Sequence, residues 1–511
     1  MVKGSIPIDC HPPLGLALLA AVVREVGHEV IAIDAFGLAP EKQTDTTVPY
    51  TSAKGYRPDL CILGITLEEV LAMIPHDVQL IGISSMFSLN WPLDRMLMNM
   101  LAAKFPNAVM IAGGESISGS AEICLQQVPA LKACVLGEGE ETLTELITAI
   151  AEQKLFSEVK GIAYRNDEGI VVKSPPRARL RQLDEIPFPA WDLMPIDNYK
   201  RHSVIAGETP RKTLAILATR GCPYECTFCT SPDMWGTRYF MRKPEKVLEE
   251  IVWLHTKFGV TNFEFYDLTA IIQKNWIIEF AKLKIATGLD ITWKIPAGTR
   301  SEAIDKEVAM YLKQSGCFSI TYAPESGSVR MLGLMKKKVK LENMLLSMKQ
   351  TNEQGVQTFI NMILGLPDET HQDVWHTLKF LALCAKHKVG DLAIAQFRPY
   401  PGSVLFDRMI AEKKLDLATD DYCIESLLII DTNHTGVVFN EHISSFYYKI
   451  YRMLAMAAFY GSAYFYYPST LAGSMRNIFN NSPKNRFEHQ ICFKLFSIFN
   501  RFKAVILTPN T

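Results

Sequence analysis

The stretch Thr219-Arg-Gly-Cys-Pro-Tyr-Glu-Cys-Thr-Phe-Cys-Thr230 is the most informative part of this 511-residue chain. It carries Cys222, Cys226 and Cys229 in the spacing C-x3-C-x2-C. Three thiolates on one short loop can bind three irons of a [4Fe-4S] cluster, and the fourth iron is then left open for a substrate or cofactor. A structural zinc site usually takes four ligands, often as two C-x2-C pairs. No second pair accompanies these cysteines, so the iron–sulfur interpretation is favoured.

The cysteine stretch follows the first of six apolar segments that alternate with helical patterns such as 244–258 and 306–315. Six strand–helix repeats predict an incomplete α/β barrel over residues 212–407. Barrels gather their chemistry at the C-terminal ends of the strands. Polar motifs fall there, among them Glu325-Ser326 and Gly365-Leu-Pro-Asp-Glu369. The predicted strands are 214–219, 262–266, 291–295, 319–322, 358–362 and 392–397.

Residues 1–150 also alternate short apolar segments with amphipathic helical patterns, which predicts a doubly wound parallel sheet. A helix is expected at 14–26 and strands at 28–34, 78–84, 108–112 and 133–136. Ligands of such sheets bind outside the carboxyl ends of the strands. Small residues that follow these strands are candidates to contact a ligand, although each could also form a simple tight turn. They are Ser84, Ser85, Gly113, Gly114, Gly137 and Gly139.

The rest of the chain is less specific. Residues 151–211 are rich in proline and predict a linker, because proline disfavours helix and central strand. Residues 408–511 are aromatic-rich and predict a helical region, with an uncharged stretch at 453–475 that could touch a membrane surface. The net charge of −1 gives no sign of nucleic-acid binding. The other eight cysteines are scattered, as expected of buried thiols in a reducing cytoplasm.

The cysteine stretch, placed after the first strand of an incomplete barrel, resembles that of the radical S-adenosylmethionine (SAM) superfamily. Phe228 matches the aromatic residue common before the last cysteine there. The resemblance implies that the three cysteines bind a [4Fe-4S] cluster. It also implies that SAM chelates the open iron and is cleaved to a 5′-deoxyadenosyl radical.

The resemblance extends to two further strand ends. It implies that Glu325 and Ser326 approach the ribose or methionyl part of SAM. It also implies that Gly365 and Glu369 lie beside the adenine. Considered alone, the two glutamates could be solvated helix caps.

The order of the N-terminal motifs resembles the cobalamin-binding class of this superfamily, and the likeness covers roughly residues 12–405. It implies that the corrin lies between the sheet edge and the barrel mouth, with its nucleotide tail beside the six small residues named above. Asp9-Cys-His11 departs from the motif that supplies a histidine to cobalt, because its glycine is displaced by one. We therefore do not expect His11 to bind cobalt. Residues 1–8 also match the usual first strand poorly.

The class implies a methyltransferase that acts on an unactivated carbon, with the methyl group delivered by cobalamin. Two alternatives remain open: an oxidative cyclase that resembles anaerobic porphyrin ring closure, and a non-catalytic cobalamin-binding sensor. The aromatic C-terminal region, with Trp191 and Trp235, suggests a large lipid-like or tetrapyrrole-like substrate, or else ordinary core packing. An electron donor such as flavodoxin or ferredoxin is expected.

Overall fold

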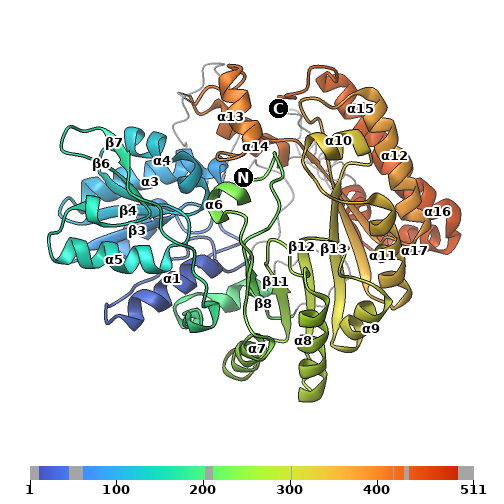
Figure 1. Ribbon diagram of the computed structural model, residues 1–511, viewed down its shortest axis with the longest axis horizontal. Coiled ribbons are helices and arrows are strands. Elements are labelled where there is room, and N and C mark those ends of the chain that lie inside the picture. The colour runs from blue at the N-terminus through green and yellow to red at the C-terminus, as the bar shows by residue number, and fades with distance from the viewer. Residues whose placement is uncertain are drawn as a thin grey trace, which may run out of the picture.

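The computed structural model describes residues 11–44, 61–201, 211–300, 302–417, 419–430 and 437–492. Figure 1 shows a sheet with its helices at one end of the molecule and an open barrel beside it. Helices from the C-terminal part of the chain cover the outer side of the barrel. The α/β architecture with a helical C-terminal region confirms the predicted fold class.

The N-terminal sheet has the strand order β3-β4-β5-β6-β7. Its first three strands are parallel, which confirms the strands predicted near 80, 110 and 134. The strands are β3 (Leu80–Ser84), β4 (Val109–Gly113), β5 (Leu131–Val135), β6 (Ile162–Arg165) and β7 (Val171–Lys173). The accompanying helices are α1 (Leu14–Glu25), α2 (Leu67–Ala72), α3 (Trp91–Lys104), α4 (Glu115–Gln127) and α5 (Glu140–Ala151).

Two segments of this part differ from the predictions. The strand expected at 28–34 is wrong, because these residues join no sheet in the part of the chain that the structure describes. Instead the segment ends in a turn, in which the Asp34 carboxylate accepts hydrogen bonds from Gly37 N at 3.0 Å and Tyr199 Oη at 2.5 Å. Residues 1–8 lie outside the described residues. β6 and β7 pair antiparallel within the segment predicted as a linker, so this segment completes the sheet.

The second sheet is the predicted incomplete barrel. Its order is β15-β14-β13-β12-β11-β8, and every neighbouring pair is parallel. All six predicted strands are therefore confirmed. They are β8 (Thr213–Ile216), β11 (Asn262–Phe265), β12 (Thr292–Thr299), β13 (Cys317–Glu325), β14 (Gln357–Leu364) and β15 (Asp391–Gln396).

Helices cover the outer face of the barrel because the strands alternate in polarity. On β11, Phe263 and Phe265 point outward into the main core, where Phe265 packs on Phe280. Glu264, which lies between them on the strand, is also buried but pairs with Lys294 instead of joining that apolar core. The covering helices are α7 (Pro244–Phe258), α8 (Lys274–Thr287), α9 (Lys306–Gln314), α10 (Val329–Leu334), α11 (Leu341–Glu353) and α12 (His371–Lys386).

The C-terminal region is helical, as predicted. α13 (Val404–Ala411) and α14 (Asp421–Ile430) precede a run of helices that packs on α12. This run is α15 (Ser445–Met456), a π-helical turn at Ala457–Gly461, α16 (Ser462–Tyr466) and α17 (Pro468–Phe479). Among the described residues, no helix has both the length and the apolar character needed to span a bilayer.

Candidate active site

The three cysteines lie on the loop between β9 (Thr219–Arg220) and α6 (Ser231–Trp235). Backbone hydrogen bonds fix this loop: Cys229 N donates to Cys226 O at 3.1 Å, and Thr227 N donates to Met335 O at 3.0 Å. Gly221 begins the loop at φ +90°, where a Cβ would lie 2.1 Å from Arg238 O. Only glycine fits this approach without strain.

The three thiols fit an iron–sulfur cluster. All are half-buried and none is in a disulfide. Burial raises the pKa of the Cys222 and Cys226 thiols, and the other cysteines of the loop raise it further. Within the described residues, no group of three or more His, Cys, Asp or Glu could hold a single metal ion. Three free thiols on one short, half-buried loop match the three cysteine ligands of a [4Fe-4S] cluster whose fourth iron is open.

Glu325 ends β13 beside the cysteine loop, at the left-handed φ of +67°. Its Oε1 accepts a hydrogen bond from Lys337 Nζ at 3.0 Å. Burial disfavours the charged lysine, but the Glu325 carboxylate and the nearby Cys226 keep the pKa of Lys337 raised. The ammonium also lies 5.9 Å from the centre of the Phe228 ring. The ion pair of Glu325 and Lys337 therefore lies next to Cys226 and Phe228 of the cysteine loop.

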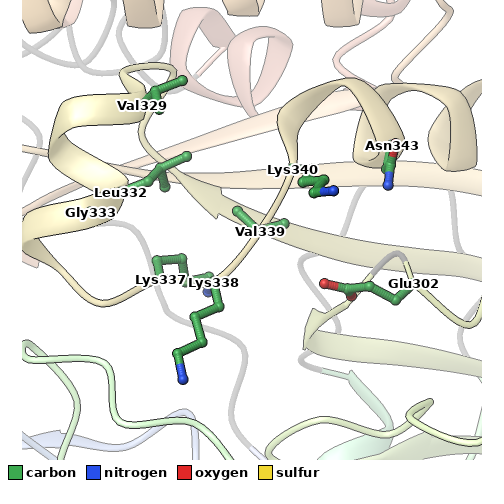
Figure 2. A pocket seen from close by; sticks show the side chains of 9 residues that line it. All are labelled: Glu302, Val329, Leu332, Gly333, Lys337, Lys338, Val339, Lys340 and Asn343. Carbon is green, nitrogen blue, oxygen red and sulfur yellow. The ribbon is translucent and has the colours of Figure 1, made fainter.

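A cavity of about 550 Å³ opens next to this ion pair (Figure 2). Its lining includes Lys337 and Lys338 after α10, and Glu302 on the opposite side. Glu302 accepts a hydrogen bond from Arg300 Nη2 at 2.7 Å, and the Arg300 guanidinium stacks 3.6 Å from the centre of the Tyr224 ring. Tyr224 lies between Cys222 and Cys226, so the cavity adjoins the loop.

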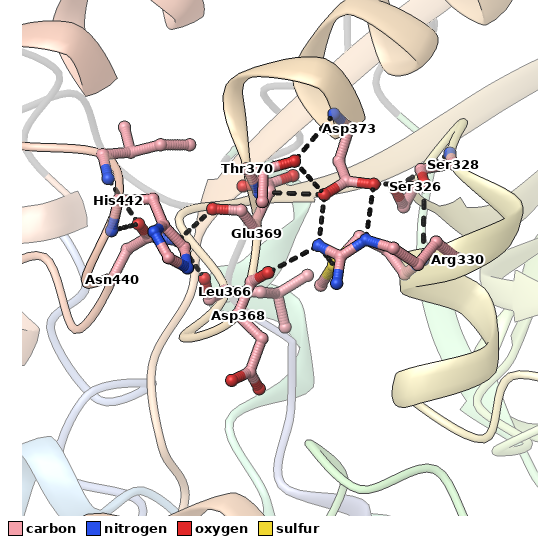
Figure 3. A network of polar contacts seen from close by, with 12 residues as sticks. Ser326, Ser328, Arg330, Leu366, Asp368, Glu369, Thr370, Asp373, Asn440 and His442 are labelled. Carbon is pink, nitrogen blue, oxygen red and sulfur yellow. Dashed lines mark hydrogen bonds and ion pairs between the residues drawn. The ribbon is translucent and has the colours of Figure 1, made fainter.

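Ser326 belongs to a buried polar network (Figure 3). Its Oγ accepts from Ser328 N at 3.2 Å and lies 3.3 Å from Thr377 Oγ1. Ser328 Oγ in turn donates to Asp373 at 2.6 Å. Although burial opposes it, hydrogen bonds from Arg330, Ser328 and Thr370 hold the pKa of Asp373 well below its ordinary value. The Ser326 hydroxyl thus holds the turn after β13, and its SAM contact stays a prediction.

Gly365 and Glu369 are bonded to each other within one turn. Gly365 N donates to Glu369 Oε2 at 2.6 Å, and Glu369 is fully buried. Burial raises the pKa of Glu369 to about 8. Its Oε1 has no hydrogen-bond partner in the described residues. Glu369 is therefore not the solvated cap that its position alone would suggest, and the predicted place of both residues beside adenine stays a prediction.

The six small residues of the N-terminal sheet gather at the ends of β3, β4 and β5. Ser84 is exposed, whereas Ser85 is buried and donates to Asp94 at 2.5 Å. A Cβ on Gly114 would lie 2.4 Å from Ser85 O, so adjacent strand ends touch there. The other three glycines each contact neighbouring protein residues. Gly113 lies near Val135, Gly137 N donates to Ser118 Oγ at 3.1 Å, and Gly139 caps α5 beside Leu19.

A buried ion-pair cluster joins this edge of the sheet to the cysteine loop. Arg220, two residues before Cys222, donates to Glu138 at 3.2 Å and to Glu140 at 2.6 Å. Arg179 donates to the same Glu138 at 2.6 Å. The pKa of Arg220 is raised because the two carboxylates outweigh the burial that opposes its charge. We call Arg220, Glu138, Glu140 and Arg179 the junction.

Comparison with known proteins agrees with this geometry. The model of the radical SAM superfamily matches residues 216–381, and that of the B12 binding domain matches residues 7–147. An uncharacterized methyltransferase of Pyrococcus horikoshii is 31% identical over 409 residues, which cover 79% of this chain and 80% of the relative. The chain belongs to the cobalamin-binding class of the radical SAM superfamily. This radical SAM enzyme therefore uses a [4Fe-4S] cluster, SAM and cobalamin.

More distant relatives of this radical SAM enzyme differ in the activity that their names give. Cytidylyl-2-hydroxyethylphosphonate methyltransferase of Streptomyces wedmorensis is 28% identical and covers 70% of each chain. An anaerobic magnesium-protoporphyrin IX monomethyl ester cyclase of Synechocystis is 26% identical, covering 78% of this chain and 73% of the relative. The structure of the methyltransferase TsrM from Kitasatospora setae shares the fold, with a TM-score of 0.59 and 20% identity over 81% of this chain and 74% of that one.

Two features of this radical SAM enzyme were missed from sequence. One is the junction, whose only signal was the acidic run at residues 138–141. The other is a buried charge pair inside the barrel, in which Lys294 Nζ lies 2.9 Å from Glu264 Oε1. His11 packs edge-on against Tyr266 and lies 3.7 Å from Glu264 Oε2. The histidine thus faces a carboxylate of the barrel, and the expectation that it does not bind cobalt stays a prediction.

The remaining cysteines and tryptophans follow the simpler expectations. Among the described residues, the cysteines outside the loop are all buried and free, and Cys10 lies outside those residues. Trp191 is buried in the main core, which confirms core packing for that residue. Trp235 lies half-buried at the end of α6, with the Arg179 guanidinium 5.1 Å from its ring centre.

Proposed function

We propose that this radical SAM enzyme transfers a methyl group to an unactivated carbon of a large organic substrate. The observation that carries the proposal is the junction, which ties the loop of Cys222 to the strand end at Gly137–Glu140. Methyl transfer from cobalamin needs both cofactors near one carbon, and a buried contact between the two loops supports that arrangement. Relatives named as methyltransferases support it too, among them hopanoid C-3 methylase of Methylococcus capsulatus, 25% identical over 69% of this chain.

In this proposal Cys222, Cys226 and Cys229 bind three irons of the cluster. When bound, the cluster and SAM supply a 5′-deoxyadenosyl radical, and cobalamin supplies the methyl group. Glu325 orients the amine or ribose of SAM through its carboxylate, and Lys337 holds that carboxylate in place. The cavity beside Lys337 and Lys338 gives a polar part of SAM or substrate a route to the loop.

The residues proposed for cobalamin are the six small ones at the ends of β3, β4 and β5. Ser84 is the exposed hydroxyl among them, so it is the first candidate to donate to the nucleotide tail. At Gly114 a side chain would clash with Ser85 O, so glycine is required where these two strand ends meet. A low-potential donor such as flavodoxin or ferredoxin would supply the electron.

Oxidative cyclisation is the second candidate, because three relatives are named as anaerobic porphyrin-ester cyclases. Both reactions would start from the same radical at the same loop. They differ in the fate of the methyl group of SAM, and this difference gives the discriminating measurement. A lipid-like or tetrapyrrole-like substrate is compatible with either.

The test uses reconstituted holoenzyme with SAM carrying a labelled methyl group, and with hopanoid lipid or magnesium-protoporphyrin ester as probe substrates. Methylation predicts a product that carries the label together with 5′-deoxyadenosine. An oxidised product without label would instead support the cyclase. The triple variant Cys222→Ala, Cys226→Ala and Cys229→Ala should lose both the cluster absorbance and 5′-deoxyadenosine. The control Cys384→Ala alters a buried thiol of the core and should keep them. A cluster that survives in the triple variant would refute the assignment.

A further inference from the structure

Helices α16 and α17 lie on the side of the barrel away from the N-terminal sheet (Figure 1). They carry large apolar side chains that are exposed. Leu471, Met475 and Phe479 recur every four residues, so they share one side of α17. Phe465 on α16 is 80% exposed and Phe479 is 82% exposed. We call these four residues the C-terminal apolar face. An exposed apolar patch of this kind marks an interaction site.

The helix that precedes this face shows the same pattern. On α15, Phe446 and Met453 are seven residues apart and thus lie on one side of the helix. They are 68% and 65% exposed. Tyr448 and Ala455, on the other side, are buried in the barrel core. The exposed apolar side chains of α15 therefore lie on one side of the helix and the buried ones on the other.

The face is held by firm packing beneath it. Ser474, on the buried side of α17, donates to Glu488 at 2.6 Å and accepts from Tyr464 Oη at 3.2 Å. The Tyr460 ring stacks on Phe487 with ring centres 4.9 Å apart. Because the inner side is fixed in this way, the outer apolar side chains are a stable feature of the fold.

The surroundings of the face are cationic. The sequence from 442 to 487 contains no Asp or Glu, whereas it contains Lys449, Arg452, Arg476, Lys484 and Arg486. Two lysines of the α12 end join them, since Lys386 Nζ lies 5.8 Å from the Tyr466 ring centre and Lys388 Nζ lies 5.1 Å from that of Tyr467.

Two acidic side chains, Glu488 and Asp391, bond to residues of these helices and of the segment that follows them. Glu488 is buried and accepts hydrogen bonds from Ser474, Asn477, Asn485 and the backbone of Lys484. Asp391 accepts from Tyr460 Oη and from Arg486 N. Asp391 Oδ2 also lies 4.0 Å from Arg486 Nε and offsets that one cation. The segment still carries Lys449, Arg452, Arg476 and Lys484, so the exterior of these helices combines apolar residues with cations.

We propose that the C-terminal apolar face docks this enzyme on an anionic lipid bilayer. Phe465 and Phe479 enter the interface between headgroups and acyl chains, and the surrounding lysines and arginines pair with lipid phosphates. Helices that bind in the plane of a bilayer have this combination of an apolar side and a Lys/Arg-rich surround. The lack of a spanning helix among the described residues agrees with a surface contact.

A second copy of the chain is a poorer occupant of the same face. A twofold contact places like surfaces against each other. Here it would bring two cationic surrounds together without the acidic partners that could neutralise them. A bilayer with anionic lipid supplies those partners. The inference does not depend on which reaction the enzyme catalyses.

The test is flotation of the full-length holoenzyme with vesicles of phosphatidylcholine alone or mixed equally with phosphatidylglycerol. We expect at least about tenfold tighter binding to the anionic vesicles, weakened by added salt, because each basic residue near the surface contributes. The variant Phe465→Ser with Phe479→Ser should lose about tenfold or more of this binding, since two phenylalanines no longer enter the interface. Arg476→Glu with Lys484→Glu should lose a similar factor on anionic vesicles only.

The matched control is Leu155→Ser, which removes an apolar side chain, 65% exposed, from the N-terminal sheet region instead of the C-terminal apolar face. It should bind vesicles like the wild type. All surface variants should keep wild-type melting temperatures, because none of the changed side chains is buried.

Several results would overturn the docking proposal. They are failure to float with anionic vesicles, equal binding to both kinds, or full binding by the phenylalanine variant. A photo-crosslinking amino acid at position 465 gives an independent check. Crosslinks to residues 493–511 or to a second copy, in place of lipid, would assign the face to that occupant and reject the bilayer.

Discussion

Replacing Arg220 by leucine tests the junction directly. The change removes the guanidinium that donates to Glu138 at 3.2 Å and to Glu140 at 2.6 Å. Glu138 keeps its bond to Arg179, but Glu140 loses the cation that neutralises it. Both carboxylates are buried and stay in place, so the variant leaves negative charge without its partner in the interface.

The expected cost follows from burial. Removing one partner of a buried ion pair destabilises a protein by about 3–5 kcal/mol, because the other charge stays desolvated. The exposed pair of Arg24 and Asp192, joined at 2.7 Å, is the matched control. Its loss in Arg24→Leu should cost less than about 1 kcal/mol. Arg24 also donates two hydrogen bonds, but to the single exposed carboxylate of Asp192, so the control removes a guanidinium with the same number of bonds outside the core.

The assay is denaturant unfolding of the reconstituted protein, combined with absorbance titration of cobalamin. Arg220→Leu should lower the free energy of unfolding by the amount given above. It should also weaken cobalamin binding, because Glu138 and Glu140 flank Gly139, one of the small residues proposed to contact cobalamin. Glu140→Leu in the same chain should restore part of the loss, with a coupling free energy of about 2 kcal/mol. If Arg220→Leu costs no more than Arg24→Leu, the junction does not hold the two parts together and the reasoning fails.

Three further changes give independent checks. Lys337→Met should weaken SAM binding by about tenfold, because it removes the ion pair with Glu325, while the iron content should stay unchanged. Lys337→Arg should retain most of the binding. Equal losses in both variants would contradict the ion-pair role. Glu369 has a folded pKa of about 8 against an ordinary 4.5, so the folded state binds the extra proton and the free energy of unfolding falls as pH rises between these values. The slope is at most about 1.4 kcal/mol per pH unit. Glu369→Gln should flatten it, as measured by unfolding curves recorded at several pH values. An unchanged slope would disprove the assignment. Gly221→Ala places a Cβ against Arg238 O at a positive φ and should cost at least about 1 kcal/mol in thermal unfolding, whereas Gly15→Ala, in open space on α1, should be neutral or stabilising.

The barrel was predictable because its signals are local. Each strand is a short apolar run between helical patterns, and six such runs leave little choice of architecture. The helix predicted at 244–258 has those bounds in the structure. The strand predicted at 28–34 failed although its apolar pattern is equally clear. Strand formation depends on a neighbour elsewhere in the chain, and no local pattern reports whether that neighbour is present.

The hairpin of β6 and β7 shows the opposite error. Proline density suggested a linker, but Pro175 and Pro176 follow β7 and leave the strands free to pair. The turn between the strands is built by Asn166, whose Oδ1 accepts from Ile170 N at 2.9 Å. The proline content of the whole segment obscured a short hairpin, although the turn residues between its strands could have predicted it.

The sequence alone determined the three cysteines on one loop and the order of sheet and barrel, because spacing and periodicity are local properties. The cofactor set was implied by the resemblance of these motifs to the cobalamin-binding class of the radical SAM superfamily. Tertiary structure alone decided that Arg220 meets Glu138 and Glu140, that Lys337 meets Glu325, and that Glu369 closes its own turn. It also decided which aromatic residues of 445–479 face outward. Ion pairs and burial depend on how separate elements approach one another, and residue spacing carries no record of that approach.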